Sequence, residues 1–337
     1  MKRILLVKTS SLGDVIHNLP AVNDILQHAP EAYIDWVVEE SFAEIPSLHP
    51  HVNSVFNVAF RRWRKNLFRQ QTWSEIAAFK KAIRQNEYDA IIDTQGLLKS
   101  ALIVRQAKGV KHGYDKNSIR EPLASCFYDQ KYAISYNQHA VVRNRTLAAL
   151  SLGYEIPKNA PDYGIEKQGI EKHGISIQSN ASVSRMDIAS HGDYIIALHG
   201  TSRDSKLWPV AHWVALGKAL ADKKLNLVLP WASDAELARA NAIASHLTNA
   251  NVLPKLSISK LAGIISQAQA AIGVDTGLSH LAAALSIPTI AIYTDTNPAL
   301  TGVFAGAHAP AINLGGIAQT PSVDEVLRAL SQVNTAS

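Results

Sequence analysis

Short apolar runs alternate with longer amphipathic segments in the first half of the chain. The runs are rich in β-branched residues and predict strands at residues 3–8, 34–38, 55–58 and 90–93. Between them, apolar residues return at helical spacing and predict helices at 15–28, 74–85 and 99–107. Strands that alternate with crossover helices predict an α/β domain built on a parallel sheet.

The pattern lapses at residues 163–191, where Gly, Ser, Asn and Gln are frequent and large apolar residues are few. A second series follows, with strands predicted at 194–198, 226–229, 270–274 and 289–293. Its helices are predicted at 212–223, 235–246, 258–268 and 278–285, and a last helix at 323–333 could pack on either domain. We therefore predict domains at 1–165 and 193–320, an irregular connection at 166–192, and a terminal helix and tail at 321–337.

Composition agrees with two folded domains, because the chain has 337 residues, of which 47% are hydrophobic and 18% charged. The longest apolar runs fall far short of the roughly 20 residues that cross a bilayer. The basic N-terminus leads into an apolar run that Lys8 interrupts, which predicts a first strand rather than a signal peptide. The single cysteine, Cys126, cannot form an internal disulfide and suits a reducing cytosol.

A net charge of +5 favours an anionic partner without identifying it, because nucleic acid, phospholipid and acidic sugar all carry negative charge. Cations concentrate in one segment, which also holds Trp63, Leu67, Phe68 and Trp73; they are Arg61, Arg62, Arg64, Lys65 and Arg69. A run of charges is most often a solvated surface. Aromatic residues among the cations also suit an interface at which rings lie at headgroup depth and cations meet phosphate.

Parallel sheets bind ligands beyond the carboxyl ends of their strands, so the segments after the strands are candidate sites. Residues 9–14 follow the first strand without a Gly-rich dinucleotide motif or a P-loop. Asp14 in this segment is either the N-cap of a helix or a general base in a cleft. Residues 93–99 follow another buried strand, and Lys99 opposes the dipole of the next helix, which favours a role with an anion.

Two segments of the second half have similar properties. Residues 199–209 gather hydroxyl groups and Lys206 in a loop that suits phosphate oxygens, or that is a solvated loop anchored by Trp208 and Pro209. Residues 271–280 run from a strand into a helix, where Gly277 allows close approach and backbone donors point at an anion. The alternative is that Asp, Thr and Ser serve only as helix caps there.

Together these segments resemble the bacterial lipopolysaccharide heptosyltransferases over nearly the whole chain. The resemblance rests on SSLGD at 10–14, DTQG at 93–96, TS at 201–202, KLWP at 206–209 and DTGLSH at 275–280. Residues 61–65, 109–113 and 120–125 resemble the branch that adds the first heptose. The resemblance implies two Rossmann-like domains facing across a cleft (the GT-B fold), with the acceptor chiefly on the first and the donor on the second. It implies inverting transfer of L-glycero-D-manno-heptose from ADP-heptose to the inner Kdo of Kdo2-lipid A, without a cofactor.

The resemblance also implies a role for each residue of this sequence that matches a family motif. Asp14 becomes the catalytic base, and Lys206 neutralises the leaving group. Donor-binding residues are Thr201, Ser202, Lys206, Glu236, Leu256, Asp275, Thr276, Gly277, Leu278, Ser279 and His280. Acceptor-binding residues are Ser10, Gly13, Arg61, Arg62, Arg64, Lys65, Gln95, Lys99 and Arg120. No metal is expected, since a lysine and a helix terminus can neutralise a diphosphate.

The family also implies a location, the cytoplasmic face of the bacterial inner membrane, with peripheral contact to its anionic surface. Two departures are visible: residues 294–298 read TDTNP where relatives often carry Gly-Pro, and Leu256 stands where close relatives have methionine. The alternatives are a heptosyltransferase II or III that acts on a heptose already in the core, and a non-catalytic nucleotide-sugar binding protein. Nucleic acid is not expected as a partner, because no recognisable binding module accompanies the basic segment.

Overall fold

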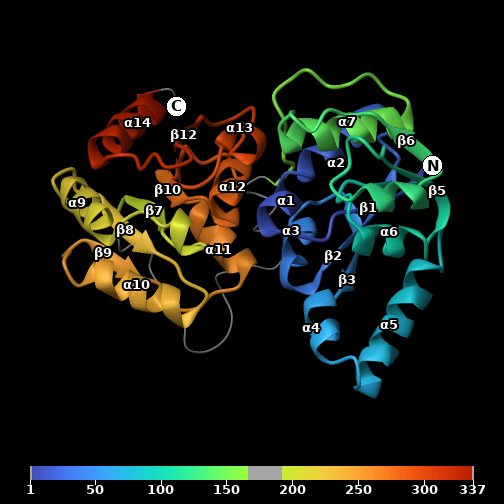
Figure 1. The fold of residues 1–337 in the computed structure, drawn as a ribbon. Coiled ribbons are helices and arrows are strands. Elements are labelled where there is room, and N and C mark those ends of the chain that lie inside the picture. The colour runs from blue at the N-terminus through green and yellow to red at the C-terminus, as the bar shows by residue number, and fades with distance from the viewer. Residues whose placement is uncertain (1, 166–191, 336–337) are drawn as a thin grey trace. The chain divides into compact units, whose positions relative to one another are not determined.

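The computed structural model describes residues 2–165 and 192–335. The chain divides after Gly164 into two compact units, Met1–Gly164 and Ile165–Ser337 (Figure 1). Of the predicted connection at 166–192, all but Gly192 lies outside the described residues. Each unit is built on its own sheet, so the two are described in turn.

The first unit contains a six-stranded sheet in the order β3-β2-β1-β4-β5-β6, in which every neighbouring pair is parallel. The strands are β1 (Arg3–Val7), β2 (Tyr33–Glu39), β3 (Val52–Val58), β4 (Glu87–Asp93), β5 (Lys108–Tyr114) and β6 (Gln130–Tyr132). The central strand β1 is buried from Ile4 onward, because helices cover both faces of a parallel sheet.

The first unit has more helices than the hydrophobic pattern predicted, and one predicted helix is divided in two. The helices are α1 (Leu12–Ile16), α2 (Leu19–His28), α3 (Glu44–Ser47), α4 (Phe60–Lys65), α5 (Gln70–Ile83), α6 (Leu98–Val104) and α7 (Ala140–Leu152). The single helix predicted at 15–28 is wrong, since α1 and α2 are separate. Pro20 lacks an N–H donor and its ring would clash with the carbonyl of Ile16, so a new helix starts with the proline in its first turn.

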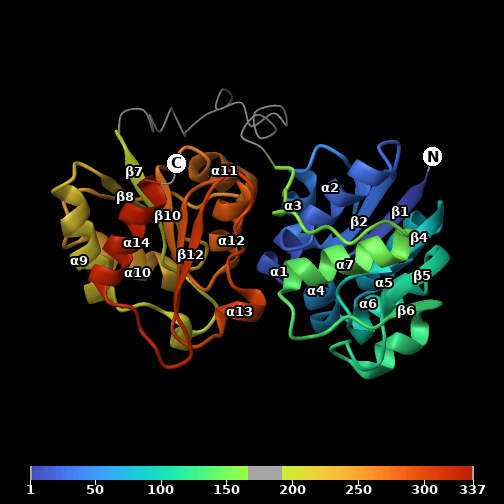
Figure 2. The same ribbon diagram turned by 90° about the horizontal axis from the view of Figure 1, so that it is seen from above.

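The second unit repeats the same plan, in the order β12-β11-β10-β7-β8-β9. Its strands are β7 (Tyr194–Leu198), β8 (Asn226–Leu229), β9 (Ala250–Val252), β10 (Ala270–Val274), β11 (Thr289–Tyr293) and β12 (Ala311–Gly315). Its helices are α9 (Val210–Ala221), α10 (Asp234–Ala244), α11 (Ile258–Ile265), α12 (Gly277–Ala284), α13 (Pro298–Thr301) and α14 (Val323–Thr335). Helix α14 packs on the second unit: Val326 and Leu330 share a core with Trp208 and Trp213, and Figure 2 shows the helix close to β12.

Read outward from the central pair of strands, both sheets have the order of a doubly wound dinucleotide-binding fold. The predicted α/β class with two Rossmann-like domains is therefore confirmed. In such sheets the chain reverses its winding direction between the two central strands, here β1 and β4 in one unit and β7 and β10 in the other. The four candidate segments are the ones that follow these four strands.

The strands that the hydrophobic pattern did not predict lie toward the edges of the sheets. Strands β6, β9 and β12 form edges, and β5 contains two glycines, Gly109 and Gly113, and is exposed or partly exposed over its first four residues. Short or half-exposed strands lack a continuous apolar run, so little local signal marks them. Among the described residues, no helix has the length and apolar character needed to cross a membrane.

Candidate active site

Hydrogen bonds connect the loops after β1 and β4 at the carboxyl ends of these strands in the first sheet. The Gln95 side-chain oxygen accepts hydrogen bonds from the backbone N–H groups of Thr9 and Ser10, both at 2.9 Å. Lys99, in the first turn of α6, donates from Nζ to the Ser10 hydroxyl at 2.8 Å. Three residues predicted to bind the acceptor, Ser10, Gln95 and Lys99, are thus brought into contact by the fold.

Asp14 lies in the first turn of α1 and is half-buried. Its Oδ2 atom accepts from the backbone N–H of Ser11 at 2.7 Å and from the Ser11 hydroxyl at 2.9 Å. The N-cap interpretation of Asp14 is therefore wrong: Ser11 is the N-cap, and Asp14 is the third helical residue of a capping box. Both hydrogen bonds go to one oxygen, and this geometry orients the carboxylate in the turn that also holds Gly13.

Two buried charges, neither of them predicted as a site residue, support these loops. Lys8 directly follows β1 and donates from Nζ to the Thr94 carbonyl at 2.8 Å, and burial lowers its pKa. Asp93 ends β4 and accepts from the Tyr128 hydroxyl at 2.7 Å and the Gln95 N–H at 2.9 Å, while burial raises its pKa. The available sequence signal was a charged residue at the end of each buried strand.

Two lysines of the first unit lie close enough to Asp14 to interact with its charge. Lys8 and Lys99 both interact electrostatically with its carboxylate, and burial lowers the pKa of Lys99. Arg61 lies with its guanidinium 5.4 Å from the centre of the Phe42 ring and interacts electrostatically with Lys99. The side chains of the other candidates, Arg64, Lys65 and Arg120, are exposed. This environment favours an anionic acceptor beside Asp14.

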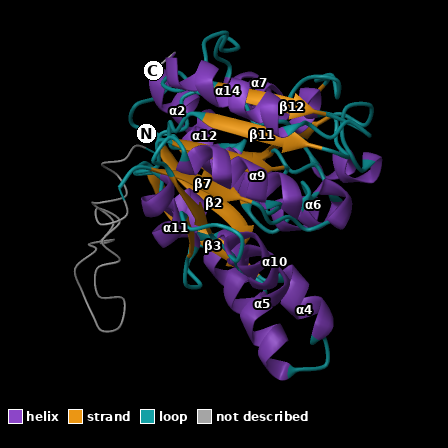
Figure 3. Cartoon of the chain, turned by 90° about the vertical axis from the view of Figure 1, so that its left-hand side faces the viewer, coloured by secondary structure: helices purple, strands orange, loops and turns teal. Residues whose placement is uncertain are grey.

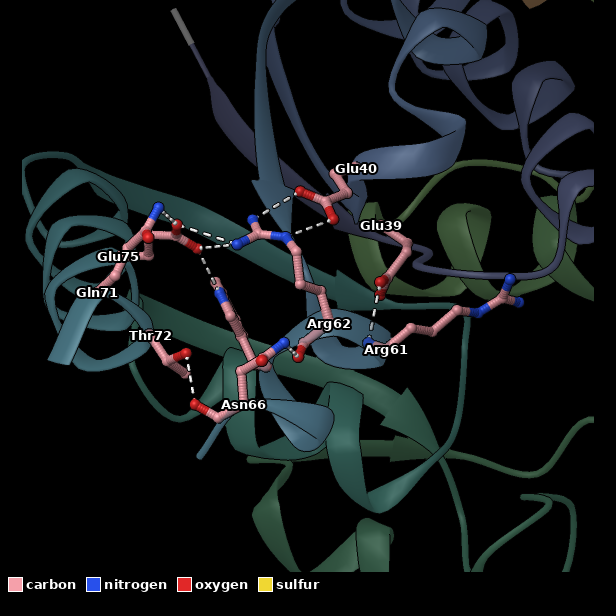
Figure 4. A network of polar contacts seen from close by, with 9 residues as sticks. Glu39, Glu40, Arg61, Arg62, Asn66, Gln71, Thr72 and Glu75 are labelled. Atoms are coloured by element: carbon pink, nitrogen blue, oxygen red, sulfur yellow. Dashed lines mark hydrogen bonds and ion pairs between the residues drawn. The ribbon is translucent and has the colours of Figure 1, made fainter. Parts of the chain in front are cut away.

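Arg62 does not belong with the free cations. Its guanidinium pairs with Glu40 at 2.9 Å and with Glu75 at 2.8 Å, and hydrogen bonds to these carboxylates raise its pKa. Trp63 is only 7% exposed and donates from Nε1 to Glu75 at 2.7 Å. Figure 4 shows the Arg62 side chain between Glu40 and Glu75. The role of Arg62 in binding the acceptor stays a prediction, although Glu40 and Glu75 already occupy its guanidinium. The interpretation of Trp63 as an interfacial ring is wrong, because α4 buries this side chain against Glu75 of α5.

The loop after β7 is joined to the loop after β10 at the carboxyl end of the second sheet. Lys206 Nζ lies 2.6 Å from Asp275 Oδ2, and both side chains are partly buried. The Thr201 hydroxyl donates to the Asp275 carbonyl at 2.8 Å. Trp208 is fully buried and donates from Nε1 to the Pro321 carbonyl at 2.8 Å, so it anchors the loop as the alternative interpretation expected, whereas Pro209 is exposed. Anchoring holds the hydroxyl and ammonium groups in place and leaves a phosphate-binding role open.

Glu236 occupies the first turn of α10. Its Oε2 atom accepts from the N–H groups of Ala232 at 2.7 Å and Ser233 at 3.1 Å. Its Oε1 atom lies against the Gly200 backbone, where a Cβ would come within 2.7 Å of it. The missing side chain at Gly200 lets the loop after β7 approach this carboxylate.

The start of α12 holds the DTGLSH motif. Asp275, Thr276, Gly277 and Leu278 are partly exposed. Ser279 is fully buried, and its hydroxyl donates to the Val274 carbonyl at 2.8 Å while its N–H donates to the Thr276 carbonyl at 3.1 Å. These contacts indicate that Ser279 shapes the turn and does not reach a donor with its side chain. His280, the next residue of the motif, is also buried.

Three further predictions concern neighbouring features. In the divergent TDTNP turn, the Thr294 hydroxyl donates to the Ser205 carbonyl at 2.7 Å, so this turn lies beside the Lys206 loop. Leu256 is half-buried in the segment before α11, and its role through the backbone stays a prediction. Across residues 2–165 and 192–335, no group of three or more His, Cys, Asp or Glu side chains could hold a metal ion.

Comparisons with known proteins agree with one another. The model of glycosyltransferase family 9 (heptosyltransferase) matches residues 76–328. Lipopolysaccharide heptosyltransferase 1 of Escherichia coli is 46% identical over 301 residues, which cover 89% of this chain and 90% of that protein. The same enzyme of Pseudomonas aeruginosa is 45% identical over 303 residues, covering 90% of this chain and 81% of that protein.

Solved structures extend the likeness to three dimensions. The Escherichia coli heptosyltransferase WaaC with ADP has a TM-score of 0.87 and 43% identity, covering 98% of this chain and 99% of that chain. The ADP-heptose lps heptosyltransferase II of Escherichia coli has a TM-score of 0.76 at 21% identity and shares the fold. Because the family model matches more than half of the chain and relatives this similar match along most of their length, the chain belongs to glycosyltransferase family 9, the heptosyltransferases.

Proposed function

We propose that this enzyme transfers L-glycero-D-manno-heptose from ADP-heptose to the inner Kdo of Kdo2-lipid A in the synthesis of the lipopolysaccharide core. The observation that carries the proposal is the group formed by Lys206, Asp275 and Thr201 at the central strands of the second sheet. A cation and a hydroxyl beside the positive end of α12 form a binding place for a diphosphate. The choice of heptose and of a lipopolysaccharide acceptor is supported by the relatives that are about 45% identical, which are lipopolysaccharide heptosyltransferases 1.

We assign the donor to the second unit. Thr201, Ser202 and the backbone at 276–278 bind the diphosphate, and Lys206 leaves part of its contact with Asp275 to meet the phosphate oxygens. Glu236 binds the ribose through its Oε1 atom, the oxygen that lies against Gly200. Leu256 contacts the adenine through its backbone, and Asp275 with His280 contacts the heptose.

We assign the acceptor and the base to the first unit. Asp14 takes the proton from the acceptor hydroxyl as that oxygen attacks the anomeric carbon, and the configuration there inverts. The bond from the anomeric carbon to the β-phosphate oxygen breaks, and ADP leaves with the electron pair. Lys206 stabilises the charge that gathers on the departing diphosphate, so its effect is largest in the transition state.

The acceptor is a lipid with phosphate and carboxylate groups, so we propose that the enzyme works peripherally on the anionic cytoplasmic face of the inner membrane. Lys99 and Arg120 face the sugar acids near Asp14, together with Ser10, Gly13 and Gln95. Arg61, Arg64 and Lys65 supply further positive charge on the same unit. Arg62 is left out of this set because it pairs with Glu40 and Glu75.

The test is mass spectrometry of the lipid products after incubation of purified enzyme with ADP-heptose and Kdo2-lipid A. One added heptose is the expected result, with one ADP released per heptose transferred. A parallel reaction uses an acceptor that already carries the first heptose. Transfer to that acceptor alone would replace the proposal with the activity of a heptosyltransferase II or III.

A further inference from the structure

Three large apolar side chains are exposed in the turn that joins α4 to α5 and in the first turn of α5. Leu67 is 47% exposed, Phe68 is 105% exposed and Trp73 is 58% exposed. Figure 3 shows α4 and α5 extending away from β3 and joined by a loop at their far end. We call residues 64–73 the hairpin tip. Clustered exposed apolar side chains mark a surface that binds a membrane or another molecule.

The hairpin tip is held in shape by its own hydrogen bonds. Trp73 donates from Nε1 to the Leu67 carbonyl at 2.8 Å, and the Thr72 hydroxyl donates to the Asn66 carbonyl at 2.8 Å. At its base, Arg62 and Trp63 both bind Glu75 and so join α4 to α5. The apolar side chains are therefore presented by an ordered turn.

Three exposed cations accompany the apolar side chains. Arg64 and Lys65 precede Leu67 and Phe68, and Arg69 follows them. In the described parts of the chain none of these three forms an ion pair with an acid, whereas Arg62 satisfies the nearby carboxylates Glu40 and Glu75. The hairpin tip thus combines an apolar end with uncompensated positive charge.

We propose that the hairpin tip is a docking element that inserts into an anionic phospholipid bilayer. Leu67, Phe68 and Trp73 enter the boundary between headgroups and acyl chains, and the flanking cations meet lipid phosphates. A bilayer is a better partner than a groove on another protein. The apolar end of the hairpin tip is small and bordered by cations, so its apolar side chains can meet the acyl chains while the cations meet the headgroups. The inference rests on the proposed function only in that the acceptor lipid lies in such a bilayer.

The test measures sedimentation of the full chain with vesicles of phosphatidylglycerol and phosphatidylethanolamine that contain no Kdo2-lipid A. The wild type is expected to sediment with the vesicles, and Leu67→Ser/Phe68→Ser to lower its partition coefficient by about tenfold or more, since burial of one large apolar side chain already supplies that factor. Neutral phosphatidylcholine vesicles or high salt should weaken binding, because the cations then lose their partners.

A matched control removes exposed apolar side chains elsewhere. Ile317→Ser/Ile156→Ser replaces residues that are 66% and 40% exposed, and it should bind vesicles like the wild type. A second readout uses brominated lipids, which quench a tryptophan only at close range. Trp73 should account for the quenching, so Trp73→Phe should abolish most of it while the protein still sediments with vesicles.

Equal vesicle binding by wild type and Leu67→Ser/Phe68→Ser would overturn the proposal, as would a wild type that does not bind. A change of oligomeric state in this variant with unchanged vesicle binding would show that the hairpin tip contacts protein instead. Turnover on a water-soluble Kdo acceptor without acyl chains should match the wild type. Vesicle binding without any heptose transfer would leave the docking element standing and refute the proposed function.

Discussion

Asp14 has two tasks in the first turn of α1, because the carboxylate that the proposed chemistry needs as a base also closes the capping box with Ser11. Both hydrogen bonds from Ser11 go to Oδ2. A capping acid at this position is therefore compatible with catalysis, and local geometry alone does not separate the two roles. Substitution does, because an amide oxygen still accepts hydrogen bonds but no longer takes a proton.

Asp14→Asn should keep the fold and slow turnover by roughly 10² to 10⁴-fold, the range typical of a lost general base. The measurement is ADP release at saturating donor and acceptor, with the melting temperature as a check on folding. Near-normal turnover in a folded Asp14→Asn protein would assign the carboxylate to the capping box alone.

Lys206 should matter more for turnover than for binding, because negative charge grows on the diphosphate as it departs. Lys206→Ala and Lys206→Met should both lower kcat as well as donor affinity. Lys223→Met, which removes an exposed lysine from the same unit, is the matched control and should change neither. If saturated turnover survives in Lys206→Ala while only donor affinity falls, the lysine binds ground state and transition state equally and has no leaving-group role.

The first unit is stabilised by polar contacts between its helices as well as by the hydrogen bonds of its sheet. Arg145 on α7 forms a bidentate ion pair with Asp24 on α2. Its Nε donates to Oδ2 at 2.7 Å and its Nη2 to Oδ1 at 2.8 Å, and both side chains are buried. Arg145 also donates to the Asn159 carbonyl at 2.7 Å, which ties the segment after α7 to the same pair. An ion pair in this environment costs much free energy when only one partner is removed.

Arg145→Met should lower the free energy of unfolding by about 3–5 kcal/mol, because Asp24 is left buried without its partner. Chemical denaturation of the full chain measures it. The double variant Asp24→Leu/Arg145→Met removes both charges and should recover part of the loss. A single variant as stable as the wild type would mean that water reaches Asp24 when the guanidinium is gone.

On the scale of the whole molecule, the proposal divides the substrates between two units of the same fold. The acceptor-side cations belong to the first sheet's unit, and Thr201, Lys206 and Asp275 belong to the second. Substitution of binding residues in one unit should therefore change the affinity for one substrate and leave the affinity for the other substrate unchanged.

Arg61→Gln/Arg64→Gln/Lys65→Gln should raise the KM for Kdo2-lipid A by about a hundredfold at low salt, since each cation near an anionic surface contributes about 1 kcal/mol. ADP-heptose affinity, measured by calorimetry, should stay near normal, and the difference in KM should shrink as salt rises. The control Lys81→Gln/Lys108→Gln/Lys131→Gln removes equal charge from other exposed positions. An unchanged KM in the first variant would leave its three cations as a solvated surface.

The sequence by itself determined the α/β class, the central strands and the segments that hold the chemistry. Those features depend on local order: an apolar run marks a buried strand, and a turn with glycine and hydroxyl residues marks its end. In the second unit the four strands predicted at 194–198, 226–229, 270–274 and 289–293 have the same bounds in the structure. The motif resemblance added the proposed roles, since no local pattern separates a capping Asp14 from a catalytic one.

Tertiary structure alone decided which side chains meet. Lys206 and Asp275 are 69 positions apart, and Arg62 and Glu40 are 22 apart. The hydrophobic pattern along the chain therefore cannot predict that either pair is in contact. The same holds for Ser279, a polar residue of a promising motif whose hydroxyl turns inward to Val274. The physical reason is that hydrophobic spacing fixes how each element buries its own face, whereas pairing between distant polar groups is set by sheet order and helix packing once the chain has folded.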